Sequence, residues 1–268
     1  DSNCGRAGDF AADPDVPAKY RVGNGYFKGY QRGHMLASED RQCSVSANAQ
    51  TFYMTNMHPQ LGRFNGYDDN GSYVWVNAEG FVRRLYQGWT RANNANDTIY
   101  VVKGGTIDHS SQIKGYTSNS GINDIIVPKY FYMALLYKTG KSQTQGGYKA
   151  IALWIPHTDG NTTAGKDIAQ KYAISIDELE EKTGIDFFCN MPDKLEEIVE
   201  ATYNLTAWVG KRTDLDPRDD KTPSSGGPRS GLGKPPNSPP AHINNNRHGV
   251  MPRRLYVMYS VLFSYREG

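Results

Sequence analysis

Apolar runs of strand length dominate the middle of this 268-residue chain and limit the folds that it can adopt. Four runs are rich in the β-branched and aromatic residues that strands favour; they cover residues 98–103, 124–127, 130–137 and 150–155. None approaches the roughly 20 consecutive apolar residues that a membrane-spanning helix needs. Hydrophobic residues make up 38% of the chain, which is enough for the core of one large domain.

Helical patterns are confined to a few segments between and after these runs. In residues 73–91, apolar side chains recur at intervals of three and four, which predicts a helix. Gly80 weakens that helix by about 1 kcal/mol relative to Ala. Short helices are expected at residues 175–183, which begin with a capping box, and at residues 192–202. Strands interleaved with a few helices predict an α+β fold.

The part of the chain before these apolar runs contains a loop-rich segment and one further candidate strand. Residues 1–30 are rich in Gly, Asp and Pro and are expected to form loops. Residues 51–56, of sequence Thr-Phe-Tyr-Met-Thr-Asn, have the composition of a further strand.

A change in composition predicts a linker near the carboxyl end. Residues 221–240 contain six Pro, four Gly and four Ser, which cannot pack a core. Residues 221–254 carry six Lys or Arg and no Asp or Glu, so this stretch is either a solvated tether or a site for polyanions. The expected organisation is a core domain at 1–220, the basic linker at 221–254, and a strand within 255–268. A lone strand is unstable, so it is expected to complete the main sheet.

The cysteines argue against a zinc site. Cys4, Cys43 and Cys189 do not follow the spacing of metal ligands. One disulfide with one free thiol, or three free thiols, are both compatible with the sequence.

Four short polar segments contain the residue types that phosphodiester hydrolysis requires, namely a base, a cation site and phosphate-binding groups. They are residues 30–35, 55–60, 64–65 and 75–83. Each segment taken singly has an ordinary structural interpretation. A lone His34 is usually structural, Asn65 before Gly66 usually marks a turn, and Glu79 with Arg83 resembles a surface ion pair.

Their order and spacing together resemble the DNA/RNA non-specific endonuclease family, which has the ββα-metal fold and includes mitochondrial endonuclease G. The sequence contains Arg32-Gly33-His34, then Asn-x-x-Pro-Gln ending at Gln60, and Asn65 five residues later. Trp75, Glu79 and Arg83 follow at intervals of four. The resemblance spans about residues 6–202 and implies a mostly antiparallel central sheet with flanking helices.

The resemblance also implies a role for each matching position. His34 would be the general base, and Asn65 would be the direct protein ligand of Mg²⁺, for which Mn²⁺ or Ca²⁺ could substitute. Arg32 would bind a substrate phosphate. The remaining matches are supporting: Glu79 would order metal-bound water, Arg83 would hold Glu79 or a phosphate, Arg6 would stabilise the transition state, and Asn56 and Gln60 would brace the site by hydrogen bonds.

Several positions depart from the family pattern. Gln31 stands where the family usually has Asp, and an inserted segment offers Asn70 as an alternative metal ligand beside Asp68 and Asp69. His58 replaces a small hydroxyl residue, so it is a second candidate base, a substrate contact or an exposed bystander. Residues 256–265 look like a strand that the family carries before Arg6, which suggests a circular permutation or two segments out of order.

The resulting hypothesis is a metal-dependent endonuclease that cleaves DNA and RNA without sequence preference and has no membrane span. The alternative is a nucleic-acid-binding protein of the same fold with impaired catalysis, which Gln31 and His58 would explain. Export to the periplasm or the extracellular space is expected from family habit and from a chain that starts at Asp1 rather than Met.

Overall fold

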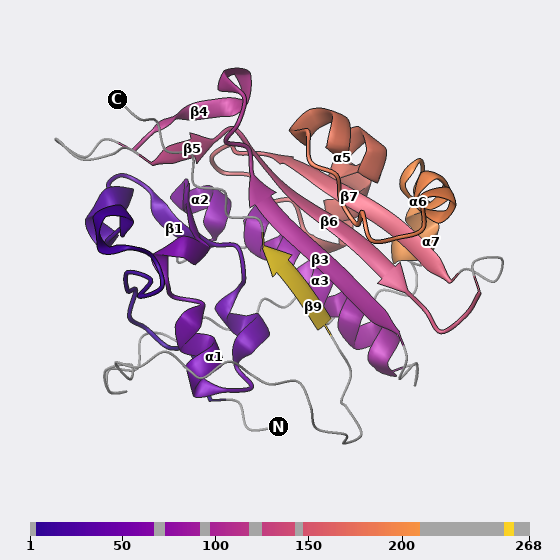
Figure 1. Cartoon of the computed structure of the whole chain (residues 1–268), viewed down its shortest axis with the longest axis horizontal. Coiled ribbons are helices and arrows are strands. Elements are labelled where there is room, and N and C mark those ends of the chain that lie inside the picture. The colour runs from indigo at the N-terminus through magenta and orange to yellow at the C-terminus, as the bar shows by residue number, and fades with distance from the viewer. Residues whose placement is uncertain are drawn as a thin grey trace.

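The main sheet of the protein runs through the middle of the molecule (Figure 1). The computed structural model describes residues 4–66, 73–91, 97–117, 125–142, 147–209 and 255–259. Within them the sheet has the strand order β8-β7-β6-β3-β9. Its strands are β3 (Thr98–Gly105), β6 (Tyr130–Lys138), β7 (Tyr148–Pro156), β8 (Ala173–Ile174) and β9 (Leu255–Tyr259). Neighbouring strands are antiparallel except β9, which pairs with β3 in parallel.

Both faces of this sheet are buried, which explains why β6 is a continuous apolar run. Side chains alternate between faces along a strand. Phe131, Met133 and Leu135 therefore join one apolar cluster, whereas Tyr132, Ala134 and Leu136 join another. The first cluster lies against α3 (Val74–Arg91), and the second lies against α5 (Ile176–Thr183) and α6 (Asp193–Glu200).

The helices cover the sheet as layers on its two faces (Figure 1). On α3, Val74, Trp75, Ala78 and Phe81 contribute to the first cluster at the spacing expected for one helical face. On α5, the Ser175 hydroxyl accepts a hydrogen bond from the Glu178 amide, so the predicted cap is present. Two shorter helices, α4 (Ile168–Tyr172) and α7 (Leu205–Val209), add to the first cluster.

A smaller unit packs beside the main sheet, shown in indigo and violet in Figure 1. It contains the antiparallel pair β1 (Gln31–His34) and β2 (Met57–Gln60) and the one-turn helix α2 (Gly62–Asn65). Another antiparallel pair, β4 (Ile113–Tyr116) and β5 (Ile126–Pro128), lies at the top of the view. The remaining elements are α1 (Val45–Gln50) and the 3-10 helices η1 (Ala18–Tyr20), η2 (Asn24–Phe27), η3 (Ser38–Arg41), η4 (Met54–Asn56), η5 (Ser110–Gln112) and η7 (Gly165–Asp167).

The α+β prediction is confirmed, as are the main strands and helices, with end shifts of a few residues. The strand expected at residues 51–56 is wrong. Those residues form turns and η4, and the strand begins only at Met57. The Asn56 side chain accounts for this difference, because it bonds backbone groups of residues 36 and 51 and holds the segment in a turn.

Some sequence predictions lie outside the described residues. These include the linker at 221–254, and Asp68, Asp69 and Asn70 in the inserted segment. Cys4, Cys43 and Cys189 are all described and form no disulfide with one another. Among the helices of the described residues, none combines the length and apolar character of a membrane span.

Candidate active site

The β1–β2 pair places His34 at the end of a short strand, opposite Met57. The preceding Gly33 is buried against the side chain of Gln60, and a Cβ at position 33 would overlap the Gln60 amide. Trp75 of α3 donates a hydrogen bond from Nε1 to the His34 carbonyl oxygen at 3.2 Å. The strand that carries His34 is therefore fixed both by its partner strand and by the long helix.

Aromatic rings and guanidinium groups surround the His34 imidazole. Its ring centroid lies 5.0 Å from that of Phe52 and 5.9 Å from that of Phe10. The guanidinium carbon of Arg6 lies 4.9 Å from the Phe52 centroid, and that of Arg32 lies 4.3 Å from the Phe10 centroid. The two rings thus hold two cations beside the imidazole by cation–π contacts.

This setting controls the protonation of His34. Burial of the ring lowers the pKa of His34 from 6.5 to about 3, together with the positive charges of Arg6, Lys103 and Arg32. The imidazole is therefore uncharged at neutral pH and has a free lone pair. An uncharged imidazole among cations is suited to accept a proton near a bound anion.

Buried polar atoms without partners gather on this strand pair. Within the described residues, His34 Nε2, Arg32 Nε and both amide atoms of Gln60 are buried and make no hydrogen bond. Such atoms are rare in folded proteins and usually mark bound water, an ion or a ligand. Another nitrogen of Arg32 does have a partner, since Nη1 donates to Asn24 Oδ1. The cluster fits a site that is completed by hydrated or anionic groups.

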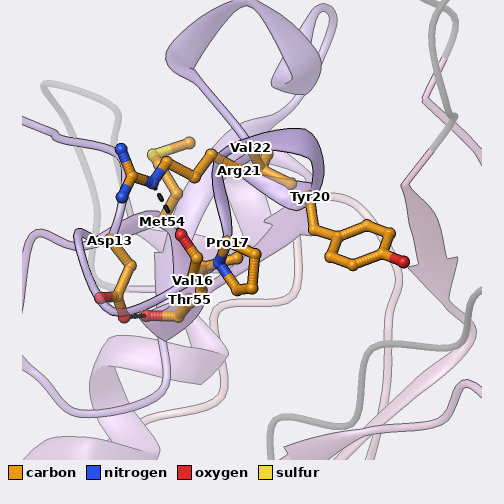
Figure 2. Close-up of a pocket in the computed structure, with 8 residues that line it drawn as sticks. All are labelled: Asp13, Val16, Pro17, Tyr20, Arg21, Val22, Met54 and Thr55. Carbon is orange, nitrogen blue, oxygen red and sulfur yellow. Dashed lines mark hydrogen bonds between the residues drawn. The ribbon is translucent and has the colours of Figure 1, made fainter.

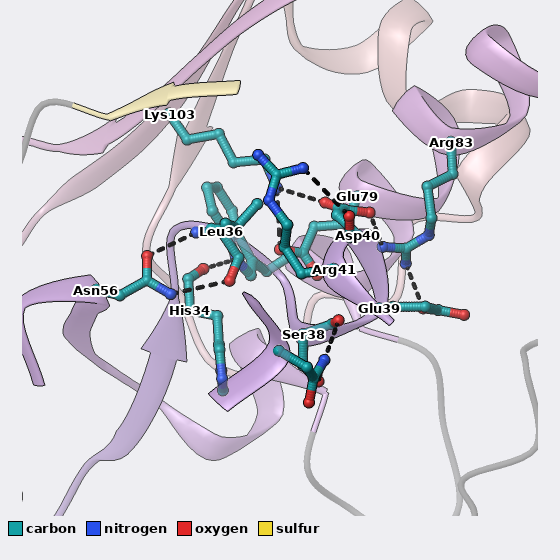
Figure 3. Close-up of polar contacts among 12 residues, drawn as sticks. His34, Leu36, Ser38, Glu39, Asp40, Arg41, Asn56, Glu79, Arg83 and Lys103 are labelled. Carbon is teal, nitrogen blue, oxygen red and sulfur yellow. Dashed lines mark hydrogen bonds and ion pairs between the residues drawn. The ribbon is translucent and has the colours of Figure 1, made fainter. Parts of the chain in front are cut away.

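Asn56 stabilises the turn that follows His34. Its Oδ1 accepts from the Leu36 amide at 2.8 Å, and its Nδ2 donates to the Leu36 carbonyl oxygen (Figure 3). The same Nδ2 also donates to the Thr51 carbonyl oxygen. The Asn56 carbonyl oxygen also accepts from the Met35 amide. These bonds connect the backbone of Met35 and Leu36, directly after His34, to the segment that precedes β2.

Asn65 is the last residue of α2, and the ends of this helix are fixed by separate contacts. At its start, the Leu61 amide donates to His157 Nε2 at 2.8 Å, while His157 Nδ1 faces the Pro128 carbonyl oxygen at 2.8 Å. At its end, Gly66 adopts a left-handed conformation with φ 106°. Phe64 stacks on Trp75, so the helix with Asn65 and the strand with His34 are anchored on the same indole.

An ionic network with a buried centre lies on the α3 side of the site (Figure 3). Lys103 is only 1% exposed, and its Nζ lies 3.2 Å from Glu79 Oε1 and 3.9 Å from Asp40 Oδ2. Arg83 pairs with Asp40 at 3.0 Å and with Glu39 at 2.8 Å. The ion-pair partner of Glu79 is therefore Lys103, whereas Arg83 holds the two carboxylates of η3.

Burial and ion pairing act in opposite directions on the pKa values of this network. Burial raises the pKa of Glu79, and the positive charges of Lys103 and Arg83 counteract the rise. For Arg83, the lowering by burial is outweighed by Glu79, Asp40 and Glu39, so its pKa is raised. Lys103 acts on both halves of the site, because it also lowers the pKa of His34. The strand pair and the network are thus electrostatically coupled.

The residues present fit a hard divalent cation. A carboxamide oxygen from half-buried Asn65 and a carboxylate from Glu79 are the oxygen donors that magnesium prefers, and one or two protein ligands suffice because this ion keeps its waters. The buried atoms without partners on His34 and Gln60 give those waters places to bind.

His58 does not belong to this site. It is 6% exposed, its ring contacts Phe131, and burial with the charge of His157 lowers its pKa to about 4. The interpretation of His58 as an exposed bystander is therefore wrong, and its burial leaves no room for a substrate contact. A pocket of about 190 Å³ beside η1 also lies apart, because Asp13, Tyr20 and Met54 line it and no predicted site residue does (Figure 2).

Sequence reasoning missed several residues of the site. Lys103 sits in an apolar strand, and only the presence of a charge in such a run could have marked it. Asp40 follows the His34 turn by six residues without a motif. Phe10 and Phe52 carried no chemical signal, and His157 was only the polar residue after Pro156.

The relatives of this chain are nucleases by name. A nuclease of Nostoc sp. is 29% identical over 206 residues, which cover 74% of this chain and 66% of that protein. Nuclease C1 of Cunninghamella echinulata is 28% identical, over 70% of this chain and 67% of the relative. Mitochondrial endonuclease G of Caenorhabditis elegans is 26% identical, over 69% and 56%. The chain thus spans about half to two thirds of the length of these relatives.

Fold and sequence family agree. The solved complex of EndoG with EndoGI contains a chain that superposes with a TM-score of 0.50 at 23% identity, covering 73% of this chain and 72% of that one. This likeness shows the fold. The family model described as DNA/RNA non-specific endonuclease matches residues 1–194, well over half of the sequence. The chain is therefore a member of the DNA/RNA non-specific endonuclease family.

Proposed function

We propose that this chain hydrolyses phosphodiester bonds of DNA and RNA without sequence preference and leaves 5′-phosphorylated ends. Family membership supports the reaction class. The observation that carries the proposal is the uncharged imidazole of His34 among cations, with its Nε2 buried and without a partner in the described chain. An exported location remains part of the proposal and is not needed for the chemistry.

His34 accepts a proton from the attacking water in this proposal. The free protein keeps the imidazole uncharged, so the base is ready before substrate binds. A bound phosphodiester adds negative charge beside the ring and raises its pKa towards the neutral range, which makes proton transfer more favourable. Arg32 and Arg6 hold the phosphate, since both guanidinium groups are fixed on rings that contact His34.

Asn65 holds a divalent cation, which we propose to be Mg²⁺ with Mn²⁺ or Ca²⁺ as substitutes, and Glu79 orders its water shell. When bound, the ion neutralises developing charge on the phosphate and leaving oxygen. Lys103 opposes the rise that burial causes in the pKa of Glu79 and so favours its carboxylate form, and Arg83 positions Asp40 beside Lys103. Asn56 and Gln60 maintain the strand pair that carries His34.

Lack of sequence preference follows from the chemistry of the proposed contacts. Arginine side chains and a hydrated cation recognise phosphates, which carry no direct base code. The proposed substrates therefore include single-stranded and double-stranded DNA and RNA, provided that the phosphate backbone can reach His34.

The experiment is cleavage of supercoiled plasmid and of unstructured RNA in Mg²⁺, with and without EDTA. His34→Ala should lower the rate by at least 100-fold, the usual contribution of a general base, with an unchanged unfolding temperature. His109→Ala removes an exposed imidazole elsewhere and is the matched control. Wild-type rates for His34→Ala would refute the assignment. Salt-sensitive binding without cleavage by the wild type would favour the alternative of a binding protein with impaired catalysis.

A further inference from the structure

An acidic cluster joins α5 to α6, far from the residues of the proposed active site. It contains Asp177 and Glu180 of α5 and Glu200 at the end of α6. One carboxylate oxygen from each lies within 4.8 Å of the other two. Both helices cover the face of the sheet opposite to α3, which carries Glu79. The cluster is therefore separate from the proposed catalytic ion.

Glu200 is the member that distinguishes this cluster from ordinary surface acids. The residue is 3% exposed, and its Oε1 is buried without a hydrogen-bond partner in the described chain. Glu196 lies one turn earlier, and its Oε1 is likewise buried and without a partner there. Buried carboxylate oxygens left in this state destabilise the fold unless something binds them.

Protein cations do not balance this charge within the described residues. Lys182 pairs instead with Glu178, which is not a member of the cluster. Among the described residues, the Phe187 amide donates a hydrogen bond to Glu180 Oε1 at 2.7 Å. The cluster thus needs either a proton or a bound cation.

We propose that Asp177, Glu180 and Glu200 bind a Ca²⁺ ion that links α5 to α6. Ca²⁺–oxygen distances of about 2.3–2.6 Å allow ligand oxygens up to roughly 4.6–5.2 Å apart, so three oxygens within 4.8 Å of one another can share one ion. Calcium accepts six to eight oxygens in irregular arrangements, whereas magnesium demands a near-ideal octahedron. Exposed Asp177 leaves one side open to water ligands, while buried Glu200 supplies the inner oxygen.

Binding should stabilise the fold rather than act on substrate. α5 and α6 pack on the same apolar cluster through Leu179 and Val199. An ion bound between the two helices would therefore stabilise their packing against the sheet. Since the ion binds the folded state alone, free Ca²⁺ in excess of its dissociation constant raises the unfolding temperature.

The test is calcium titration of EDTA-treated full chain by calorimetry and thermal unfolding. An Asn65→Ala background removes the proposed active-site ligand, so that one remaining binding event can be assigned. We expect Ca²⁺ to raise the unfolding temperature of both wild type and Asn65→Ala. Glu200→Gln should abolish this response, and Asp177→Asn should weaken Ca²⁺ binding by roughly 10-fold or more. Glu197→Gln, an exposed change on the same helix, should behave as wild type.

Two controls make the outcome decisive. Glu200→Gln without calcium should fold at least as stably as wild type, because it removes repulsion, and it should retain Mg²⁺-dependent cleavage. Asp177→Asn tests the site through a surface residue even if Glu200→Gln folds poorly. The proposal is overturned if Ca²⁺ leaves the wild-type unfolding temperature unchanged, which would assign a shared proton to the cluster. An equal calcium response in wild type, Glu200→Gln and Asp177→Asn would also overturn it.

Discussion

The imidazole of His34 contacts two phenyl rings and lies near three cationic side chains, and these neighbours determine its charge. The sequence motif identified His34 but not this environment. Phe10 and Phe52 come from segments without regular periodicity, so their approach to His34 depends on loop paths that no local pattern encodes. The motif therefore predicts which residue acts, while tertiary structure determines its protonation.

We expect the ring of His34 to titrate far below 6.5 in the free protein. Replacing Arg32 with Met removes one of the charges that lower the pKa, so the titration should move to higher pH. Heteronuclear NMR of labelled histidine rings would follow it. Arg41→Met removes a cation that does not act on His34 and should leave the curve unchanged. A wild-type midpoint near 6.5 would contradict the described environment.

Lys103 and Glu79 should depend on each other for stability. Lys103→Met leaves a buried carboxylate without its nearest cation, which should cost about 3–5 kcal/mol in unfolding free energy. Adding Glu79→Gln should recover much of that loss, because the uncompensated charge is gone. Urea unfolding of the two single variants and the double variant gives the coupling energy. Strict additivity would show that the pair contributes no coupling.

At the scale of elements, long helices and strands could be predicted from the periodicity of their apolar residues, whereas a helix of one turn could not. The helix α3 and the strands β3, β6 and β7 could be predicted because their apolar patterns are long and each buries a defined face. The helix α2 has one turn, which is too short to be stable alone. Its position depends on a hydrogen bond between Leu61 and His157, residues that lie 96 positions apart. No local signal predicts such a contact.

His157 should therefore act as a positioning residue for Asn65. His157→Ala leaves the Leu61 amide without its acceptor, and the loss of this bond should cost about 1–3 kcal/mol. We expect the Mg²⁺ concentration for half-maximal cleavage to rise several-fold, because α2 carries the proposed metal ligand. His157→Gln, which retains an acceptor, should recover part of the effect, and His109→Ala should have none. An unchanged Mg²⁺ requirement in His157→Ala would exclude this role.

At the scale of the whole molecule, buried histidines make the fold sensitive to acid. His58 and His157 are both nearly inaccessible, and burial lowers the pKa of each to about 4. In the unfolded chain the same groups titrate near 6.5. As the pH falls through 6.5 the unfolded state binds protons first, so these residues reduce stability progressively down to about pH 4.

Replacing His58 with Gln should reduce this acid sensitivity. Each such site contributes up to about 1.4 kcal/mol per pH unit to the slope of unfolding free energy between those limits. The slope of the variant between pH 6 and pH 5 should be smaller by up to that amount. Denaturant unfolding at a series of pH values measures it. Above pH 7.5 the two curves should run parallel, and equal slopes at acidic pH would mean that His58 is not protonated on unfolding.

The edge strand β9 has a consequence for the order in which the sheet assembles. Strands β3, β6 and β7 lie within residues 98–156, with the β4–β5 pair between β3 and β6, whereas Ile99 of β3 pairs with Leu255, 156 positions later. Closing so long a loop is entropically slow compared with forming adjacent hairpins. We therefore expect three strands to be in place while one side of β3 still offers unpaired amides and carbonyls to any neighbouring chain. During synthesis and refolding, the edge of β3 is where this protein should be most prone to self-association.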